Sequence, residues 1–254
     1  MPLLSVQSVS KRFGGLDALK EVTFGVYRDQ IKALIGPNGA GKTTLFNIVS
    51  GSYRPTEGRV QFAGVDVAGK APHRICRMGI GRTFQHSLVF ADMTVLENVA
   101  VGRYSRTRAG LISAALTLPR HRNEEAETFK AAHEALRRVG LDHLAGEPAE
   151  NLPMGERHLL EIARALASGP QLLLLDEPAA GLNDDETRRL ADTVRKIRDE
   201  GVTVLLVEHD MTFVMEISDE VVVLDYGRKI AEGPPLMIQN NEEVIRAYLG
   251  EELE

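Results

Sequence analysis

The first third of the chain has the alternating pattern that is typical of β-strands. Up to about residue 85, short runs rich in β-branched and aromatic residues are separated by turn-forming residues. Four such runs are expected to form strands: residues 4–9, 22–26, 32–35 and 58–64. One helix is expected over residues 44–50, and a further strand-like run covers residues 80–84. This part is therefore predicted to be β-rich with one major helix.

The middle of the chain has a different pattern, in which helix-forming residues predominate. An amphipathic helix is predicted over residues 124–139, because apolar side chains recur there at helical spacing. They are Phe129, Ala132, Leu136 and Val139. Gly140 is expected to end this helix, since glycine commonly stands just past a helix end. An arginine-rich stretch runs from Arg103 to Arg122, and we favour a solvated surface for it over a partner-binding patch.

From residue 156 onward, predicted helices and strands alternate. The helices cover residues 157–167 and 184–200, and the buried strands cover residues 172–175, 202–207 and 221–224. Such alternation implies a mainly parallel sheet covered by helices. We therefore expect an α/β fold in which residues 1–85 and 156–254 form one core, interrupted by a helical insertion at residues 86–155.

Length and composition narrow the classes of protein. The chain has 254 residues, enough for one large domain or two modest ones with a real core. Its formal charge of −6 argues against a general nucleic-acid binder. The single cysteine, Cys76, excludes an internal disulfide framework. We expect no secretory signal and no membrane span, so any role at a membrane would require another chain.

Residues 36–43 carry the most informative motif, a glycine-rich loop that fits G-x-x-x-x-G-K-[ST] at every fixed position. Its glycines allow backbone N–H groups to approach phosphate oxygens, Lys42 adds positive charge, and Thr43 offers a hydroxyl to Mg²⁺. A predicted strand precedes the loop and a predicted helix follows it, so the helix N-terminus also faces the phosphates. The expected nucleotide-binding residues are Gly36, Pro37, Asn38, Gly39, Ala40, Gly41, Lys42, Thr43 and Thr44. The chain is therefore predicted to bind a nucleoside triphosphate.

Further polar residues follow other predicted strands. Asp176 and Glu177 end the run at 172–175, where Asp176 can hold Mg²⁺ and Glu177 can polarise a water for attack on the γ-phosphate. The alternative, a loop that merely begins before Pro178, is weakened by the motif at 36–43. His209 follows the run at 202–207; a lone histidine there is more often structural, yet it is a credible γ-phosphate sensor. Gln85 can position Mg²⁺ or the attacking water.

These motifs, in this order, resemble the ATP-binding subunits of ABC transporters over essentially the whole chain. The resemblance implies a P-loop NTPase core with a mainly parallel sheet, an N-terminal antiparallel β subdomain and an inserted helical subdomain. Residues 36–43 correspond to the Walker A loop and residues 179–183 to the D-loop. The resemblance also implies roles for single residues. Gln85 resembles the Q-loop glutamine, Asp176 the Walker B aspartate and Glu177 the catalytic glutamate. His209 resembles the switch histidine, and Phe13 stands where the family stacks an aromatic ring on adenine.

The chain departs from the family at the signature motif. The usual form is Leu-Ser-Gly-Gly-Gln, which the opposite subunit presents to the γ-phosphate, whereas residues 152–156 read Leu-Pro-Met-Gly-Glu. Pro153 has neither a hydroxyl nor an N–H, Met154 adds bulk, and Glu156 adds negative charge. Gly155 and the N-terminus of the following helix remain. A weaker phosphate clamp is therefore expected, and not an inactive one.

Three segments narrow the resemblance to the subunit of branched-chain amino-acid importers: residues 177–183, 208–211 and 240–250. The wider group also moves urea, amides and aromatic acids. The resemblance implies ATP and Mg²⁺ as cofactors, a second ATPase subunit that is identical or paralogous, integral-membrane permease subunits and a periplasmic substrate-binding protein. It also implies a place at the cytoplasmic face of the cell membrane and no nucleic-acid partner.

Two other functions compete with import. One is a soluble ABC-type ATPase that acts on nucleic acid or ribosomes; such proteins usually carry two cassettes or a long coiled coil, and this chain has one cassette and no sustained heptads. The other is a regulatory nucleotide-binding module without catalysis. The presence of Asp176, Glu177 and His209 together argues against that module.

Overall fold

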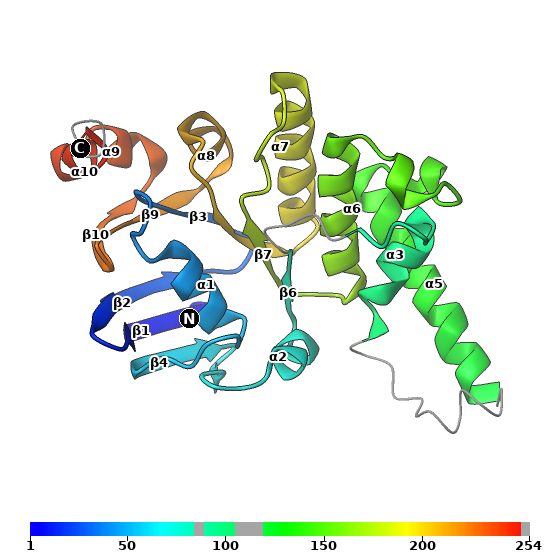
Figure 1. Ribbon diagram of the computed structural model, residues 1–254, viewed down its shortest axis with the longest axis horizontal. Coiled ribbons are helices and arrows are strands. Elements are labelled where there is room, and N and C mark those ends of the chain that lie inside the picture. Colours follow the sequence, from blue (N-terminus) through cyan, green and yellow to red (C-terminus); the bar gives the residue numbers. More distant parts are fainter. Residues whose placement is uncertain (84–88, 105–118, 250–254) are drawn as a thin grey trace.

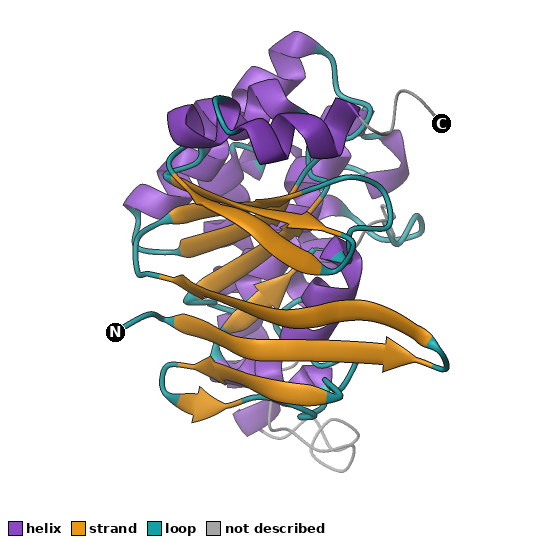
Figure 2. Cartoon of the chain, turned by 90° about the vertical axis from the view of Figure 1, so that its left-hand side faces the viewer, coloured by secondary structure: helices purple, strands orange, loops and turns teal. Residues whose placement is uncertain are grey.

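The computed structural model describes residues 1–83, 89–104 and 119–249, and at residues 119–123 and 249 only the backbone. Gln85 and most of the arginine-rich stretch therefore lie outside the described residues. The strands form two sheets (Figure 1). In Figure 2 the smaller sheet is the lower layer, and the larger sheet lies between it and the helices at the top.

The smaller sheet is antiparallel, with the order β2-β1-β4-β5. Its strands are β1 (Leu4–Phe13), β2 (Leu16–Val26), β4 (Glu57–Phe62) and β5 (Val65–Asp66). The larger sheet has the order β10-β9-β3-β8-β7-β6, and only β10 runs antiparallel to its neighbour. Its strands are β3 (Ile31–Ile35), β6 (Ile80–Arg82), β7 (Leu172–Asp176), β8 (Thr203–Val207), β9 (Glu220–Asp225) and β10 (Arg228–Gly233). The α/β class and the mainly parallel sheet are confirmed.

Helices cover the larger sheet on both faces. The helices are α1 (Lys42–Val49), α2 (Pro72–Met78), α3 (Val95–Val101), α5 (Pro119–Val139), α6 (Met154–Ala167), α7 (Asp184–Asp199), α8 (Met211–Ile217), α9 (Pro235–Gln239) and α10 (Glu242–Leu249), with the short 3₁₀ turns η2 (Asp142–Leu144) and η3 (Ala149–Asn151). Helices α3, α5 and α6 pack together at one end of the molecule (Figure 1).

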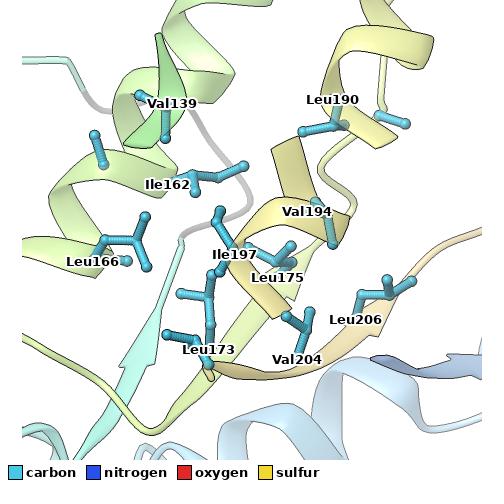
Figure 3. Close-up of a cluster of buried hydrophobic side chains, with 14 of the residues drawn as sticks. Val139, Ile162, Leu166, Leu173, Leu175, Leu190, Val194, Ile197, Val204 and Leu206 are labelled. Carbon is cyan, nitrogen blue, oxygen red and sulfur yellow. The ribbon is translucent and has the colours of Figure 1, made fainter. Parts of the chain in front are cut away.

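Strand β7 shows why the apolar runs of this sheet are continuous. Leu172 and Leu174 belong to the core between the two sheets, which also contains α1, whereas Leu173 and Leu175 face α7. Figure 3 shows this second core. Its central side chains are Leu173, Leu175, Val204 and Leu206 from the sheet and Leu190, Val194 and Ile197 from α7. A strand covered on both faces must be apolar on both.

Three helices begin earlier than the sequence pattern indicates. Helix α5 begins at Pro119 instead of residue 124, α6 at Met154 instead of residue 157, and α1 at Lys42 instead of residue 44. The apolar periodicity starts only where a helix begins to pack, so polar first turns are missed by that signal. For α1 the difference matters, because Lys42 and Thr43 belong to the first helical turn.

Candidate active site at the carboxyl edge of the sheet

The loop between β3 and α1 has a shape that only glycine permits at two positions. Gly36 has φ +148°, and a Cβ there would lie 2.1 Å from the carbonyl oxygen of Leu224. At Gly41, with φ +102°, a Cβ would lie 2.6 Å from the carbonyl oxygen of Ala18. The loop therefore fits closely against β9 and β2, and α1 begins directly after it. This arrangement presents a helix N-terminus and glycine-rich backbone to an anion.

Lys42 lies over this loop. Its Nζ donates hydrogen bonds to the carbonyl oxygens of Gly36 at 2.5 Å and Pro37 at 2.9 Å. Asn38 and Gly39 at the tip of the loop are exposed, as is Thr43 on the first helical turn. A positive charge, an exposed hydroxyl and backbone N–H groups thus meet at one place, as triphosphate binding requires.

Asp176 and Glu177 lie at the carboxyl edge of the larger sheet, where the phosphate loop also lies. Strands β7 and β8 are parallel neighbours, and Asp176 pairs with Val207 in their register. Glu177 and His209 therefore follow adjacent strand ends, as the sequence predicts. The Asp176 side chain is only 1% exposed. Its Oδ1 atom is buried and has no hydrogen-bond partner among the residues that the structure describes. A buried, unsatisfied carboxylate oxygen fits Mg²⁺ or a water bound to it.

Arg82, at the end of β6, is the partner of Asp176 that the sequence reasoning missed. Its Nη2 donates to Asp176 Oδ2 at 2.9 Å. Its Nη1 donates to Asn47 Oδ1 at 2.8 Å, on α1, and to Ser50 Oγ at 2.6 Å, the C-cap of that helix. One guanidinium therefore links the helix after the phosphate loop to the acidic strand. An arginine in the otherwise apolar run at 80–84 was the available signal.

Glu177 has a backbone conformation that is uncommon for its residue type. Its φ is +49°, a left-handed value that costs a non-glycine residue about 1 kcal/mol or more. The conformation is held from both sides: the Glu177 N–H donates to Val207 O at 2.9 Å, and the Glu177 carbonyl accepts from Ala180 N at 3.2 Å. The strain directs this half-buried side chain away from the regular alternation of β7. Retained strain of this kind is common at catalytic positions.

His209 is exposed to solvent and directly follows the buried residue Glu208. Its side chain is 64% exposed, whereas that of Glu208 is fully buried. Glu208 Oε2 accepts the N–H of His209 at 3.0 Å, and His209 Nδ1 lies 3.6 Å from the same oxygen. Burial raises the pKa of Glu208, although three backbone hydrogen bonds and His209 act in the opposite direction.

Phe13 ends β1 with 41% of its surface exposed. Its ring makes an edge-to-face contact with Tyr53 at a centroid distance of 5.3 Å, and Lys11 Nζ lies 4.8 Å from its centroid. Tyr53 was not recognised from the sequence because it lies 40 positions away, in the turn after α1. The partly exposed Phe13 ring can stack on a flat heterocycle such as adenine.

Residues 152–156, the signature segment, include the N-cap and first turn of α6 and pack on residues that follow β7. A Cβ on Gly155 would lie 2.7 Å from Glu186 Oε1, and a Cβ on Gly181 would lie 3.1 Å from Met154 Cε. His158, one turn into α6, donates a hydrogen bond to the carbonyl of Pro178. The signature segment thus contacts residues 178–186 of its own chain. In Figure 1, α6 and α1 lie on opposite sides of β7.

Comparison with known sequences decides the family. Residues 19–180 match the ABC transporter family, and residues 228–254 match the branched-chain amino acid ATP-binding cassette transporter family. The chain is 45% identical over 251 residues to the high-affinity branched-chain amino acid transport ATP-binding protein LivG of Escherichia coli (strain K12), covering 98% of both chains. This chain belongs to the ABC transporter family. It is an ABC ATPase, and the fold class and enzyme class expected from the sequence are confirmed.

Solved ABC cassettes share its fold. An ATP-binding cassette of an ABC transporter in its ADP conformation is 31% identical, with a TM-score of 0.87, and the match covers 98% of this chain and 99% of that one. A bacterial ABC transporter cassette in a dimeric structure is 25% identical, with a TM-score of 0.75, and the match covers 91% of this chain and 98% of that one. Binding of nucleotide by the ABC ATPase is therefore expected on both sequence and fold.

The ABC ATPase also has a mostly apolar cavity of about 380 Å³ beside the site. It lies between α2, α3 and α6, and its lining includes Pro72, Cys76, Phe90, Val101, Arg164 and Ala165. Arg82 reaches it from the other side. None of the helices in the described part of the chain is long and apolar enough to cross a membrane.

Proposed function

We propose that this ABC ATPase powers import of branched-chain amino acids, or of related amino acids and amides, through separate membrane subunits. The single observation that carries the proposal is the match to the branched-chain family at residues 228–254, outside the general ABC match. The 45% identity to a branched-chain amino acid transport protein over nearly the whole chain supports it.

In this proposal the described residues divide the work of hydrolysis. Phe13 stacks on adenine, residues 36–44 bind the phosphates, and Lys42 neutralises charge at the β/γ-phosphates. Mg²⁺, when bound by Thr43, Asp176 and Gln85, supplies further positive charge at the phosphates. Glu177 orients the attacking water and His209 contacts the γ-phosphate. The catalysis is mainly positional and electrostatic.

The site is completed by a second ATPase chain, which is identical or paralogous. Met154 of the signature segment is 55% exposed, and α6 and α1 lie on opposite sides of β7 (Figure 1), so we assign the segment to the nucleotide of a facing chain. Gly155 and the N-terminus of α6 are its phosphate-binding elements. ATP binding closes the pair and hydrolysis reopens it. The dimeric arrangement of a related cassette supports this geometry.

Membrane permease subunits receive this motion. We place their contact at the cavity between α2, α3 and α6, with residues 86–155 acting as the helical subdomain and Gln85 at its hinge. The apolar lining suits a short helix of a permease, and Arg164, one of the lining residues, suits that helix's C-terminal end. The ATPase then lies at the cytoplasmic face of the membrane, and a periplasmic binding protein delivers the substrate to the permease.

Uptake of labelled leucine tests the proposal. A strain lacking this chain is complemented with the wild type or with Glu177→Gln, and ATP binding by both purified chains is measured in parallel. We expect wild-type complementation to restore uptake, and Glu177→Gln to bind ATP normally but to lose turnover and uptake by at least about a hundredfold. Leucine uptake that is independent of the chain would refute the substrate, and near-normal turnover in Glu177→Gln would refute the role of Glu177.

A further inference from the structure

Glu208 is a fully buried carboxylate that the catalytic scheme above does not use. It directly follows β8, and its side chain is 0% exposed. Among the described residues its only ion-pair neighbour is His209, at 3.6 Å. Burying a carboxylate without a strong cationic partner is costly unless hydrogen bonds compensate it. Its presence therefore calls for an explanation.

The contacts of Glu208 supply that explanation. Oε1 accepts the N–H of Ala179 at 2.7 Å. Oε2 accepts the N–H of His209 at 3.0 Å and that of Asp210 at 3.4 Å. Ala179 lies two residues after Glu177, in the loop that follows β7. One side chain thus holds backbone groups of two loops, each of which carries a residue of the proposed hydrolytic machinery.

We propose that Glu208 is a positioning residue that holds the loops after β7 and β8 as one unit and so sets Glu177 and His209 relative to each other. The inference rests on the proposed function, because it assigns the two loops their catalytic roles. The backbone of Glu177 is itself strained, and the Ala179 hydrogen bond is one of the contacts that keep this loop in place.

A carboxylate is the side chain that this position requires. It offers two acceptor oxygens to three donors in two different loops. Glutamine keeps one acceptor but turns an NH₂ donor toward backbone N–H groups, so one loop is released. Methionine preserves length and packing but accepts neither set of hydrogen bonds. Both substitutions therefore separate the positioning role from filling of the core.

A double-mutant cycle on the purified full-length chain tests the inference. The ATPase kcat and KM are measured for the wild type, Glu208→Gln, His209→Ala and the double variant, with thermal unfolding of each. We expect Glu208→Gln to lower kcat by about tenfold to a hundredfold with KM within about twofold. In the His209→Ala background we expect Glu208→Gln to lower kcat by less than about threefold, because the His209 side chain that Glu208 positions is already absent.

Two further variants control the cycle. Glu208→Met leaves the N–H groups of Ala179, His209 and Asp210 without their acceptor, so it should lower kcat at least as much as Glu208→Gln does, and its thermal unfolding shows whether it is folded at the assay temperature. Glu161→Gln changes another buried glutamate, on α6, and should keep wild-type kcat. Additive losses in the cycle, or normal kcat in both Glu208 variants, would overturn the inference alone. Normal kcat in His209→Ala and Glu177→Gln would instead overturn the catalytic assignments on which it rests.

Discussion

The phosphate loop (residues 36–41) stands directly before a helix and the signature segment (residues 152–156) spans the start of one; both helix N-termini suit phosphate, yet the two segments are built differently. In the phosphate loop, Gly36 and Gly41 stand where any side chain would meet a backbone carbonyl. In the signature segment, Met154 replaces a glycine of the family pattern and is 55% exposed. The phosphate loop is therefore enclosed by backbone at these two glycines, whereas the signature segment is open to solvent at Met154.

The difference follows from what surrounds each segment. Rigid backbone of β9 and β2 encloses the phosphate loop, so its shape cannot adjust to an added Cβ. In the signature segment, Gly155 lies against the flexible carboxylate of Glu186, and the side chain of Met154 lies partly against Gly181 and partly in solvent. A side chain added in the signature segment can shift a flexible neighbour or extend into solvent, whereas one added at Gly36 or Gly41 would have to displace backbone.

The largest effect is expected from Gly36→Ala. The added methyl group would lie 2.1 Å from Leu224 O at φ +148°, so the loop or β9 must move. We expect ATP binding to weaken by at least about a hundredfold, since loop geometry sets every phosphate contact. Binding of a fluorescent ATP analogue, together with thermal unfolding, measures the effect.

Gly39→Ala is the matched control for this substitution. Gly39 also has a positive φ, +77°, but a Cβ there would meet nothing within 4 Å. We expect only the conformational cost of about 1 kcal/mol in the free energy of unfolding, with ATP still bound. An equal loss of ATP binding in Gly36→Ala and Gly39→Ala would show that the positive φ of these glycines, and not the contact with β9, determines the shape of the loop.

A related contrast separates the features of the fold and the site that could be predicted from the sequence from those that could not. Local signals predicted the phosphate loop, every strand of the larger sheet except β10, and the strand-end positions of Asp176, Glu177 and His209, because each depends on adjacent residues. Long-range partners left no local signal. Buried Lys32 is an example: its Nζ binds Glu220 at 2.8 Å and Glu232 at 2.6 Å, on strands β9 and β10.

A second limit is that several partners are backbone groups. Glu208 meets the N–H groups of Ala179, His209 and Asp210, and His158 meets the carbonyl of Pro178. Every residue has these groups, so residue types cannot indicate such contacts. Arg82, which joins α1 to Asp176, could be found only once β6 was placed beside β7.

A smaller effect is expected from Pro153→Ser in the signature segment. Serine restores a hydroxyl and an N–H toward the phosphate of a facing chain. One added hydrogen bond to a charged phosphate is worth about 1.5 kcal/mol or more, so ATP-dependent dimerisation should tighten at least about tenfold. Light scattering of the Glu177→Gln background, which retains ATP, measures the dimer affinity.

Pro153→Ala separates the two restored groups, because it returns the N–H without the hydroxyl. Pro153 is also the N-cap of α6, and serine is a better N-cap than alanine. A rise in unfolding temperature of the monomer without tighter dimerisation would mean that serine only caps its own helix. That result would remove Pro153 from the phosphate-binding half of the site.

The smallest effect concerns pH, through the contact between α6 and the loop after β7. Burial lowers the pKa of His158, although its hydrogen bond to Pro178 and the charge of Glu186 act in the opposite direction. Its Nε2 atom is buried without a partner among the described residues. The folded chain therefore favours neutral His158, and the unfolded chain takes up a proton below about pH 6.5. The stability that His158 contributes is present above that pH and is lost as pH falls toward the lowered pKa.

His158→Gln should remove this dependence while keeping an amide donor near Pro178. We expect the unfolding temperature of the wild type to fall more than that of the variant between pH 7 and pH 5, by a few degrees at most. The charge of Glu186 raises the pKa of His158, so Glu186→Gln is measured as well. Without that charge, the unfolding temperature should fall more steeply between pH 7 and pH 5 than it does in the wild type. Parallel pH profiles for the wild type and His158→Gln would show that α6 is joined to the loop after β7 by packing alone.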